Sequence, residues 1–284
     1  MSAVSRVSYR TSKLISQTLK YVIAITASAI IIIPLIMAVL GGFKTNSDLQ
    51  TNSYGLPTTF NFTNYTSILA SSSFWQQLVN STVIMFATSV GVVILSAMPA
   101  FVFARMSFRG RGLVFNYFTL GLLFPITVAM LPLYITLRDM QLIDSLWGII
   151  IPQVAFGVPG SILILRNFFT AIPKELEEAA ALDGCATVGF FWRILIPLAR
   201  PSLAAVAVLT LVASWNAFFL PLLVLNNNAL WTLPLGIMQY QGQFAQDWSK
   251  ILAFVSLALI PTIILYLLAE KQIVAGLTAG AVKG

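Results

Sequence analysis

The most informative stretch of this chain is PKELEEAAALDGCATVGFFWRILIP, residues 173–197. Its first half has the pattern of a short helix. Pro173 suits a first helical turn, and three glutamates over residues 175–178 favour the positive end of a helix dipole. Gly184 can adopt positive φ and end that helix. A second amphipathic run begins near Thr187 and closes at Pro197, so the stretch predicts two short helices joined at a glycine.

The chain on both sides of this stretch is apolar. Of its 284 residues, 58% are hydrophobic and 9% are charged, whereas a soluble domain carries roughly 25% charged residues. A helix that crosses a bilayer needs about 20 mostly apolar residues. We therefore expect an all-α membrane protein with six transmembrane helices, which fall at residues 21–41, 80–104, 113–135, 146–165, 202–224 and 251–269.

The basic residues are unevenly distributed between the loops. With the N-terminus inside, thirteen of the sixteen Lys and Arg residues face the cytoplasm, and only Lys44, Arg138 and Lys250 lie outside. This asymmetry predicts cytoplasmic N- and C-termini and external loops at 42–79, 136–145 and 225–250. The expected organisation is a cytoplasmic segment over 1–20, a six-span domain over 21–270 with a cytoplasmic loop at 166–200, and a cytoplasmic tail over 271–284.

Several classes of function are excluded by what the sequence lacks. It contains no histidine and a single cysteine, Cys185, so histidine-based catalysis and multi-cysteine metal sites are ruled out. Residues 42–45 lack the adjacent Gly-Lys pair of a phosphate-binding loop. The formal charge of +7 is too sparse for a nucleic-acid surface. No charged residue falls in the middle of a span, so the chain has no evident energy source of its own.

Polar residues enter the spans at a few positions, notably Asn80 and the pair Trp215 and Asn216. An unsatisfied amide that faces lipid is costly, so each must find a helix partner or a watery cavity. These three residues are the candidates for the translocation path, and interhelical hydrogen bonding is the alternative.

The 173–197 stretch also matches a known motif. Glu178, Ala179 and Ala180, followed by Gly184, Ile194 and Pro197, reproduce the spacing E-A-A-x3-G-x9-I-x-L-P, with Ile196 in place of the leucine. This pattern resembles the EAA loop of ABC importer permeases. By composition alone, the two short helices either dock on another protein or pack on their own bundle.

The resemblance extends over nearly the whole chain. Residues 103–110, 214–218, 232–236 and 276–284 are similar to the MalG-like permease subunit of carbohydrate ABC importers. The tail GLTAGAVKG, residues 276–284, is the segment that narrows the resemblance to this subunit type.

The resemblance implies a type I ABC importer permease fold in a bacterial or archaeal plasma membrane. Such a subunit pairs with a second, MalF-like permease, sits on two ATPase subunits that hold ATP and Mg²⁺, and receives solute from an external binding protein. It binds no cofactor and is not itself an enzyme. A coupling helix between spans 4 and 5 would contact one ATPase subunit through Glu178, Ala179, Ala180 and Gly184, with Asp183 included by proximity, and the tail would reach between the ATPase subunits.

The function expected is import of a neutral sugar, oligosaccharide or polyol, because the spans offer no ion to pair with an anionic cargo. A permease for glycerol phosphate or an acidic sugar is the alternative, since the sister permease can supply basic residues. A passive solute channel, from a different class, leaves the 173–197 stretch without a role. An intramembrane hydrolase lacks a nucleophile paired with a base.

Overall fold

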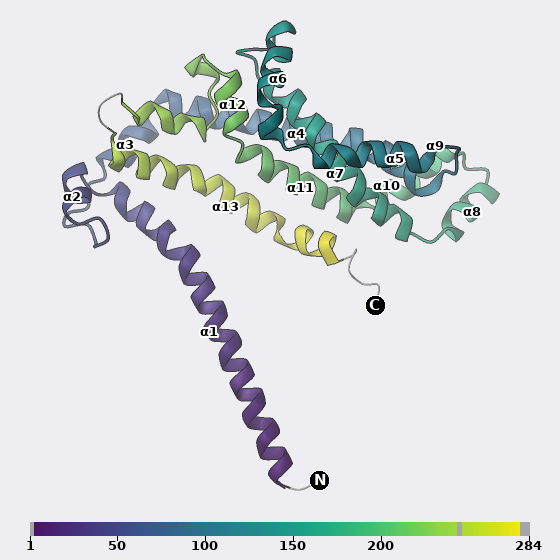
Figure 1. The fold of residues 1–284 in the computed structure, drawn as a ribbon, viewed down its shortest axis with the longest axis horizontal. Coiled ribbons are helices and arrows are strands. Elements are labelled where there is room, and N and C mark those ends of the chain that lie inside the picture. Colours follow the sequence, from purple (N-terminus) through teal and green to yellow (C-terminus); the bar gives the residue numbers. More distant parts are fainter. Residues whose placement is uncertain (1–2, 243–245, 279–284) are drawn as a thin grey trace. The chain divides into compact units, whose positions relative to one another are not determined.

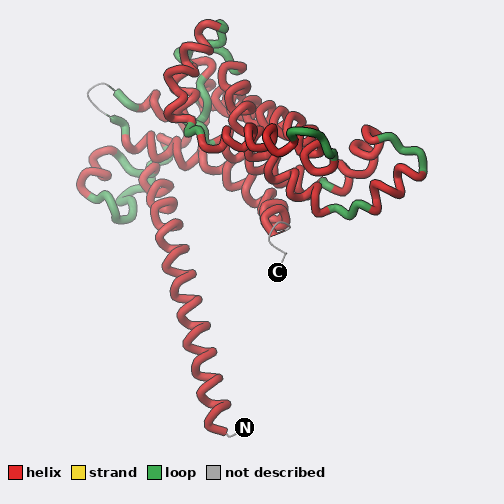
Figure 2. The backbone as a smooth tube through the Cα atoms, turned by 45° about the vertical axis from the view of Figure 1, so that its right-hand side comes forward, coloured by secondary structure: helices red, strands yellow, loops and turns green. Residues whose placement is uncertain are grey.

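The computed structural model describes residues 3–242 and 246–278. Within these ranges the chain is almost entirely helical, as Figure 2 shows. It divides into two compact units, one formed by residues 1–70 and 239–257 and the other by residues 71–238 and 258–284. The last long helix, α13 (Trp248–Thr278), begins in the first unit and continues in the second.

Four helices of the described residues are long and apolar enough to cross a membrane. They are residues 16–42 of α1 (Ala3–Gly42), α4 (Ser72–Arg105), α7 (Trp147–Ala171) and residues 248–267 of α13. Two bent helix pairs, over residues 111–139 and 187–215, pass the same criterion when each is taken as one span, which raises the number to six. The all-α fold with six apolar spans is therefore the one that the sequence predicts.

The first bent pair shows how a proline breaks an apolar run. It consists of α5 (Arg111–Leu120), the 3₁₀ turn η1 (Gly121–Leu123) and α6 (Ile126–Asp139), with a bend of 97°. Phe124 stands between the two halves with φ −90° and ψ 105°, directly before Pro125. A residue that precedes proline is disfavoured in the helical region, so the span expected over 113–135 is interrupted here.

The span expected over 202–224 is also two helices, α11 (Arg200–Trp215) and α12 (Phe219–Val224). Asn216 ends α11 with φ −83° and ψ 1°, and its amide Nδ2 donates to the carbonyl of Val212 at 2.9 Å. Short polar side chains compete in this way with the helical hydrogen bonds and favour helix ends. Trp215 and Asn216 consequently lie at the interruption of the span.

The second unit is organised around α4, which runs beside α7 and α11 (Figure 1). Two glycines allow the close approach of α4 and α7. A Cβ atom on Gly91 would lie 2.9 Å from Val154, and one on Gly157 would lie 2.8 Å from Val92. Small residues of this kind bring membrane helices into van der Waals contact. Ser89 adds a polar link, because its hydroxyl donates to the Ala207 carbonyl of α11 at 3.0 Å.

Apolar clusters consolidate both ends of the second unit. In Figure 1, α8 (Glu175–Leu182) and α9 (Thr187–Phe190) lie at one end, and α6 and α12 lie at the other. The first end contains buried Phe101, Phe169 and Phe191. The second contains Ile84, Ile149 and Leu220, among other residues.

The first unit holds α1, α2 (Asn46–Thr51), α3 (Thr63–Ala70) and the start of α13. The ring of Phe43 packs against three other aromatic rings between residues 60 and 65. Lys44 is buried, and its ammonium donates to the backbone carbonyls of Asn52 at 2.6 Å and Gly55 at 2.7 Å. The segment expected as an external loop at 42–79 thus has defined structure and contains two short helices before α4 begins.

Candidate functional site

The 166–200 loop contains the first short helix that the sequence predicts. Its helix α8 begins at Glu175, two residues after Pro173, and ends at Leu182. The backbone N–H of Gly184 donates to the Ala181 carbonyl, and that of Cys185 donates to the Ala180 carbonyl. These two bonds form a Schellman motif, whose glycine must be left-handed. Gly184 has φ +76°, which confirms the predicted helix end.

The residues predicted to contact an ATPase subunit do not all face the same way. Glu178, Ala179, Asp183 and Gly184 are exposed. Ala180 is only 6% exposed and belongs to the apolar cluster at this end of the second unit. One side of α8 therefore packs on its own bundle, which is one of the two alternatives left by composition, while the other side is open.

The second short helix of the loop is less regular than the sequence predicts. It begins at Thr187 with Ala186 as the cap, becomes a π-helical turn over η2 (Phe191–Leu195), and continues through Pro197 in α10 (Ile196–Leu198). Pro197 lacks the N–H that an α-helix requires, and a π-helical turn is one way to accommodate the missing bond. The rings of Phe190 and Phe191 pack against Phe101 of α4, so this helix anchors the loop.

Arg105 links α4 to this loop, and sequence reasoning missed it. Its side chain is 2% exposed, although it is charged and ends a membrane-spanning helix. Its Nη2 donates to the carbonyl of Ile172 at 2.6 Å, and its Nη1 lies 3.8 Å from Glu177 Oε2 in α8. Ile172 directly follows α7, so one guanidinium joins the ends of α4 and α7 to the first turn of α8.

A second arginine supports the same end of α4. Arg166 donates through Nε to the Phe103 carbonyl at 3.3 Å, and its guanidinium carbon lies 4.2 Å from the centre of the Phe115 ring in α5. The carbonyl of Phe103 also accepts from Arg111. The guanidinium groups therefore donate hydrogen bonds to the Phe103 carbonyl near the end of α4, where the last carbonyls have no N–H partner within the helix.

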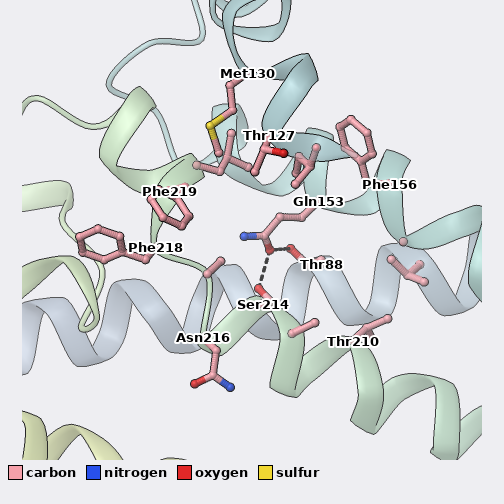
Figure 3. A pocket seen from close by; sticks show the side chains of 16 residues that line it. Thr88, Thr127, Met130, Gln153, Phe156, Thr210, Ser214, Asn216, Phe218 and Phe219 are labelled. Carbon is pink, nitrogen blue, oxygen red and sulfur yellow. Dashed lines mark hydrogen bonds between the residues drawn. The ribbon is translucent and has the colours of Figure 1, made fainter. Parts of the chain in front are cut away.

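A cavity of about 440 Å³ lies farther along the same helices (Figure 3). It is lined by residues of α4, α6, α7 and α11 and by the interruption between α11 and α12. Its polar lining residues are Thr88, Thr127, Gln153, Thr210, Ser214 and Asn216, and its aromatic ones are Phe156, Phe218 and Phe219. No Asp, Glu, Lys or Arg is among the residues that line it.

Gln153 of α7 is the centre of the polar lining, as Figure 3 shows. Its Oε1 accepts hydrogen bonds from the hydroxyl of Thr88 at 3.2 Å and from the hydroxyl of Ser214 at 2.6 Å. Its Nε2 is buried and has no hydrogen-bond partner. The amide is thus held at its oxygen by α4 and α11 and carries a free donor at its nitrogen.

The three candidates for the translocation path are not brought together. Asn216 lines the cavity, but its amide points away from Gln153 in Figure 3. Trp215 is buried beside it, and its side chain is not among the lining residues. Asn80 lies near the loop after α12, where its Nδ2 donates to the carbonyls of Ala229 at 2.9 Å and Trp231 at 3.0 Å.

The loop after α12 is fastened by three polar side chains of the second unit. Besides Asn80, the hydroxyl of Ser81 accepts from the N–H of Leu233 at 2.7 Å. The carboxylate of Asp144 accepts from the N–H groups of Asn226 at 2.6 Å and Asn227 at 2.8 Å. The hydrogen bond from the Asn227 backbone has the largest effect on the pKa of Asp144 and lowers it. Burial, the next-largest effect, raises this pKa, and the hydrogen bonds from Asn226 lower it again, so it lies below its ordinary value.

This lowered pKa predicts a pH dependence of the loop. Because the carboxylate pKa is lower in the folded loop than in the free chain, its stabilising effect is complete above about pH 5 and is lost as the pH falls through the folded pKa. Hydrogen–deuterium exchange of residues 225–238, corrected for the intrinsic rate at each pH, is expected to rise at the acid end.

Asp144→Asn keeps a residue that tolerates the φ of 55° at this position and removes the charge. Its loop is expected to exchange faster at neutral pH and to lose the acid-dependent change. Asp139→Asn, which alters an exposed carboxylate paired with neighbouring Arg138, is the control and should behave as wild type. An unchanged pH profile in Asp144→Asn would remove Asp144 as its cause.

Two further expectations concern sites outside this region. The tail predicted to reach between ATPase subunits falls mostly on residues 279–284, which lie outside the described residues. Within residues 3–242 and 246–278, no group of three or more His, Cys, Asp or Glu side chains is placed to hold a metal ion.

Comparison with known proteins places the chain among transport proteins. The family model described as binding-protein-dependent transport system inner membrane component matches residues 92–273. A probable ABC transporter permease, YurM of Bacillus subtilis, is 34% identical over 256 residues, which cover 88% of this chain and 83% of that protein. The arabinooligosaccharide transport permease AraQ of Halalkalibacterium halodurans is 32% identical over 259 residues, covering 90% and 92%.

The fold is also found among solved structures. A bacterial ABC transporter involved in the import of the acidic polysaccharide alginate has a chain that matches with a TM-score of 0.79 at 22% identity, over 92% of this chain and 97% of that one. At this level of identity the match concerns the fold.

Proposed function

Because the chain belongs to the family of inner-membrane components of binding-protein-dependent transport systems, we propose that it is the permease subunit of an ATP-driven importer of a neutral sugar, oligosaccharide or polyol. The observation that carries the substrate class is the cavity beside α4, α7 and α11, whose lining is mostly apolar, includes three aromatic rings and four hydroxyl-bearing side chains, and contains no charged side chain. The arabinooligosaccharide permease among its relatives supports this class.

The energy for transport is proposed to come from partners. The chain would pair with a second, MalF-like permease, receive solute from an external binding protein, and rest on two ATPase subunits that bind ATP and Mg²⁺. The asymmetry of Lys and Arg supports cytoplasmic termini and a cytoplasmic 166–200 loop.

We assign coupling to the exposed side of α8. Its docking residues would be Glu178, Ala179, Asp183 and Gly184, and Leu182, which is 91% exposed, adds an apolar contact. Ala180 would act from inside, because it seats α8 on its own bundle. A displacement of α8 by the ATPase subunit would pass to α4 through Arg105 and through the aromatic contacts of Phe190 and Phe191.

This coupling route connects the loop to the cavity. Arg105 and Thr88 belong to the same helix α4, about 25 Å apart at a rise of 1.5 Å per residue, with Pro99 between them. Because the helix continues through Pro99, a shift at Arg105 would be passed along α4 to Thr88 at the cavity wall. No bond is made or broken in this chain; it converts motion of the loop into a change of access to the cavity.

The substrate class is tested by competition. The complete transporter, reconstituted in liposomes with its binding protein, is expected to take up neutral disaccharides and to be inhibited by neutral solutes. Glycerol phosphate and uronic acids should compete poorly, because an unpaired anion in a cavity without basic residues is costly. Strong inhibition by anions alone would favour the acidic-cargo alternative, and uptake by this chain without ATPase subunits would favour a passive channel.

A further inference from the structure

The amide of Gln153 has a free hydrogen-bond donor inside the protein. Leaving a buried donor without a partner is unfavourable, because the group has given up its hydrogen bonds to water. Here the donor belongs to a side chain in the wall of a cavity of about 440 Å³, within the size range of ligand pockets. The oxygen of the same amide is fixed by Thr88 and Ser214, so the nitrogen is not free to turn toward them.

The residues around the Gln153 nitrogen determine which class of ligand can accept its hydrogen bond. A lipid chain fills an apolar cavity but offers no acceptor to the amide. An anion accepts the hydrogen bond but meets no basic side chain among the lining residues. A neutral glycosyl unit matches both features, because its hydroxyl groups accept hydrogen bonds and its C–H face packs on aromatic rings such as Phe156 and Phe218.

We propose that Gln153 donates a hydrogen bond to a hydroxyl of one neutral glycosyl unit held in this cavity between α4, α7 and α11. The proposal rests on the proposed function and adds that this chain itself contacts the solute. The proposed hydrogen bond from Gln153 is expected to depend on the conformation of the transporter. Its amide joins α4 through Thr88 and α11 through Ser214, so movement of either helix changes the geometry of the donor.

The test uses the complete transporter in liposomes, with saturating binding protein. Maltose, cellobiose, xylobiose and diacetylchitobiose are the first probes, and the disaccharide with the fastest uptake is then compared with its monodeoxy derivatives. Neutral monosaccharides, longer oligosaccharides and polyols are tested next if none of these is taken up; if wild type imports no neutral solute of these kinds, the proposed substrate class fails, independently of Gln153.

Gln153→Met removes the donor and keeps a similar length. It is expected to lower maximal uptake about threefold to tenfold, the effect of one lost hydrogen bond. In wild type, removal of one particular sugar hydroxyl should cause a similar loss, whereas in Gln153→Met the same deoxy sugar should be taken up as fast as its parent. Ser96→Ala is the matched control, since it deletes a buried hydroxyl of α4 that does not line the cavity.

If Gln153 has only a structural role, the expected result is different. Such a role would slow uptake of the parent sugar and of every deoxy derivative by the same factor, and that outcome would overturn the proposal. If the Gln153→Met transporter takes up the parent sugar as fast as the Ser96→Ala transporter, the proposal is overturned as well.

A second measurement does not depend on a stable Gln153 variant. Thr127→Cys, made in a Cys185→Ser background, places a thiol on an exposed side chain of the cavity lining. The selected disaccharide is expected to slow its reaction with a small water-soluble thiol reagent when solute has been delivered to the transporter. Labelling that is unaffected by the sugar in every state of the ATPase cycle would place the solute elsewhere.

Discussion

Gly184→Val is expected to abolish sugar uptake by the assembled transporter while the subunit still inserts into the membrane. The glycine ends α8 at φ +76° in a Schellman motif. A β-branched residue is a strong outlier in this region, and the left-handed conformation costs an ordinary residue about 1–2 kcal/mol. The end of α8 would rearrange, and the exposed docking residues beside it would move. Uptake and ATP hydrolysis measured on purified, reconstituted complexes test this.

Gly184→Asn is the matched control, because asparagine tolerates positive φ far better than valine. A Cβ atom at this position would meet nothing within 4 Å in this chain, so neither side chain clashes internally. Gly184→Asn should therefore retain most of the uptake. Equal losses in both variants would show that the position is sensitive to size against a partner, and the conformational explanation would be wrong.

Arg105→Met should uncouple ATP hydrolysis from transport and lower uptake by about tenfold or more. The variant leaves the carbonyl of Ile172 without its charged donor, and hydrogen bonds to charged groups contribute about 1.5–3 kcal/mol. The contact with Glu177 contributes less, because its oxygen is 3.8 Å away and that side chain is partly exposed. With this link removed, motion of α8 should reach α4 only through the aromatic contacts of Phe190 and Phe191 with Phe101, so α4 should follow the ATPase subunit less closely. The measurement is the ratio of solute imported to ATP hydrolysed.

Two further variants separate the contributions at Arg105. Glu177→Gln should change the ratio only slightly if the Ile172 carbonyl is the main partner. Arg138→Met, which removes an exposed arginine paired with Asp139, is the control for charge and should leave the ratio unchanged. An Arg105→Met transporter with normal uptake and a normal ratio would exclude Arg105 from the coupling route.

Local features of the sequence were enough to predict the spans and the loop helix. An apolar run of about 20 residues has few alternatives to a helix in a bilayer, so four of the six stretches were found as continuous helices, while those expected over 113–135 and 202–224 are interrupted. Gly184 was predicted as a helix end because a preference for positive φ is a property of the residue itself. Family membership followed from a motif that is contiguous in the chain, residues 178–197.

Features that depend on distant residues were not predicted. Arg105 was counted only as a cytoplasmic charge, and its partner Ile172 lies 67 residues away. Gln153 was one of several polar residues within spans, and nothing nearby in the sequence distinguished it. An arginine at the end of an apolar run is a sequence signal that can point to Arg105. Gln153 has no comparable signal in the sequence.

The sequence by itself determined that this protein is a helical membrane protein with a helical loop over residues 173–197, because hydrophobic length and a turn-forming glycine act over a few residues. Only the tertiary structure decided which polar groups meet. Thr88, Gln153 and Ser214 come from three different helices and share one hydrogen-bonded centre, whereas Asn80 donates to carbonyls of the loop after α12. The reason is geometric: a hydrogen bond requires atoms to approach within about 3 Å, and for groups on separate helices the packing of those helices sets that distance.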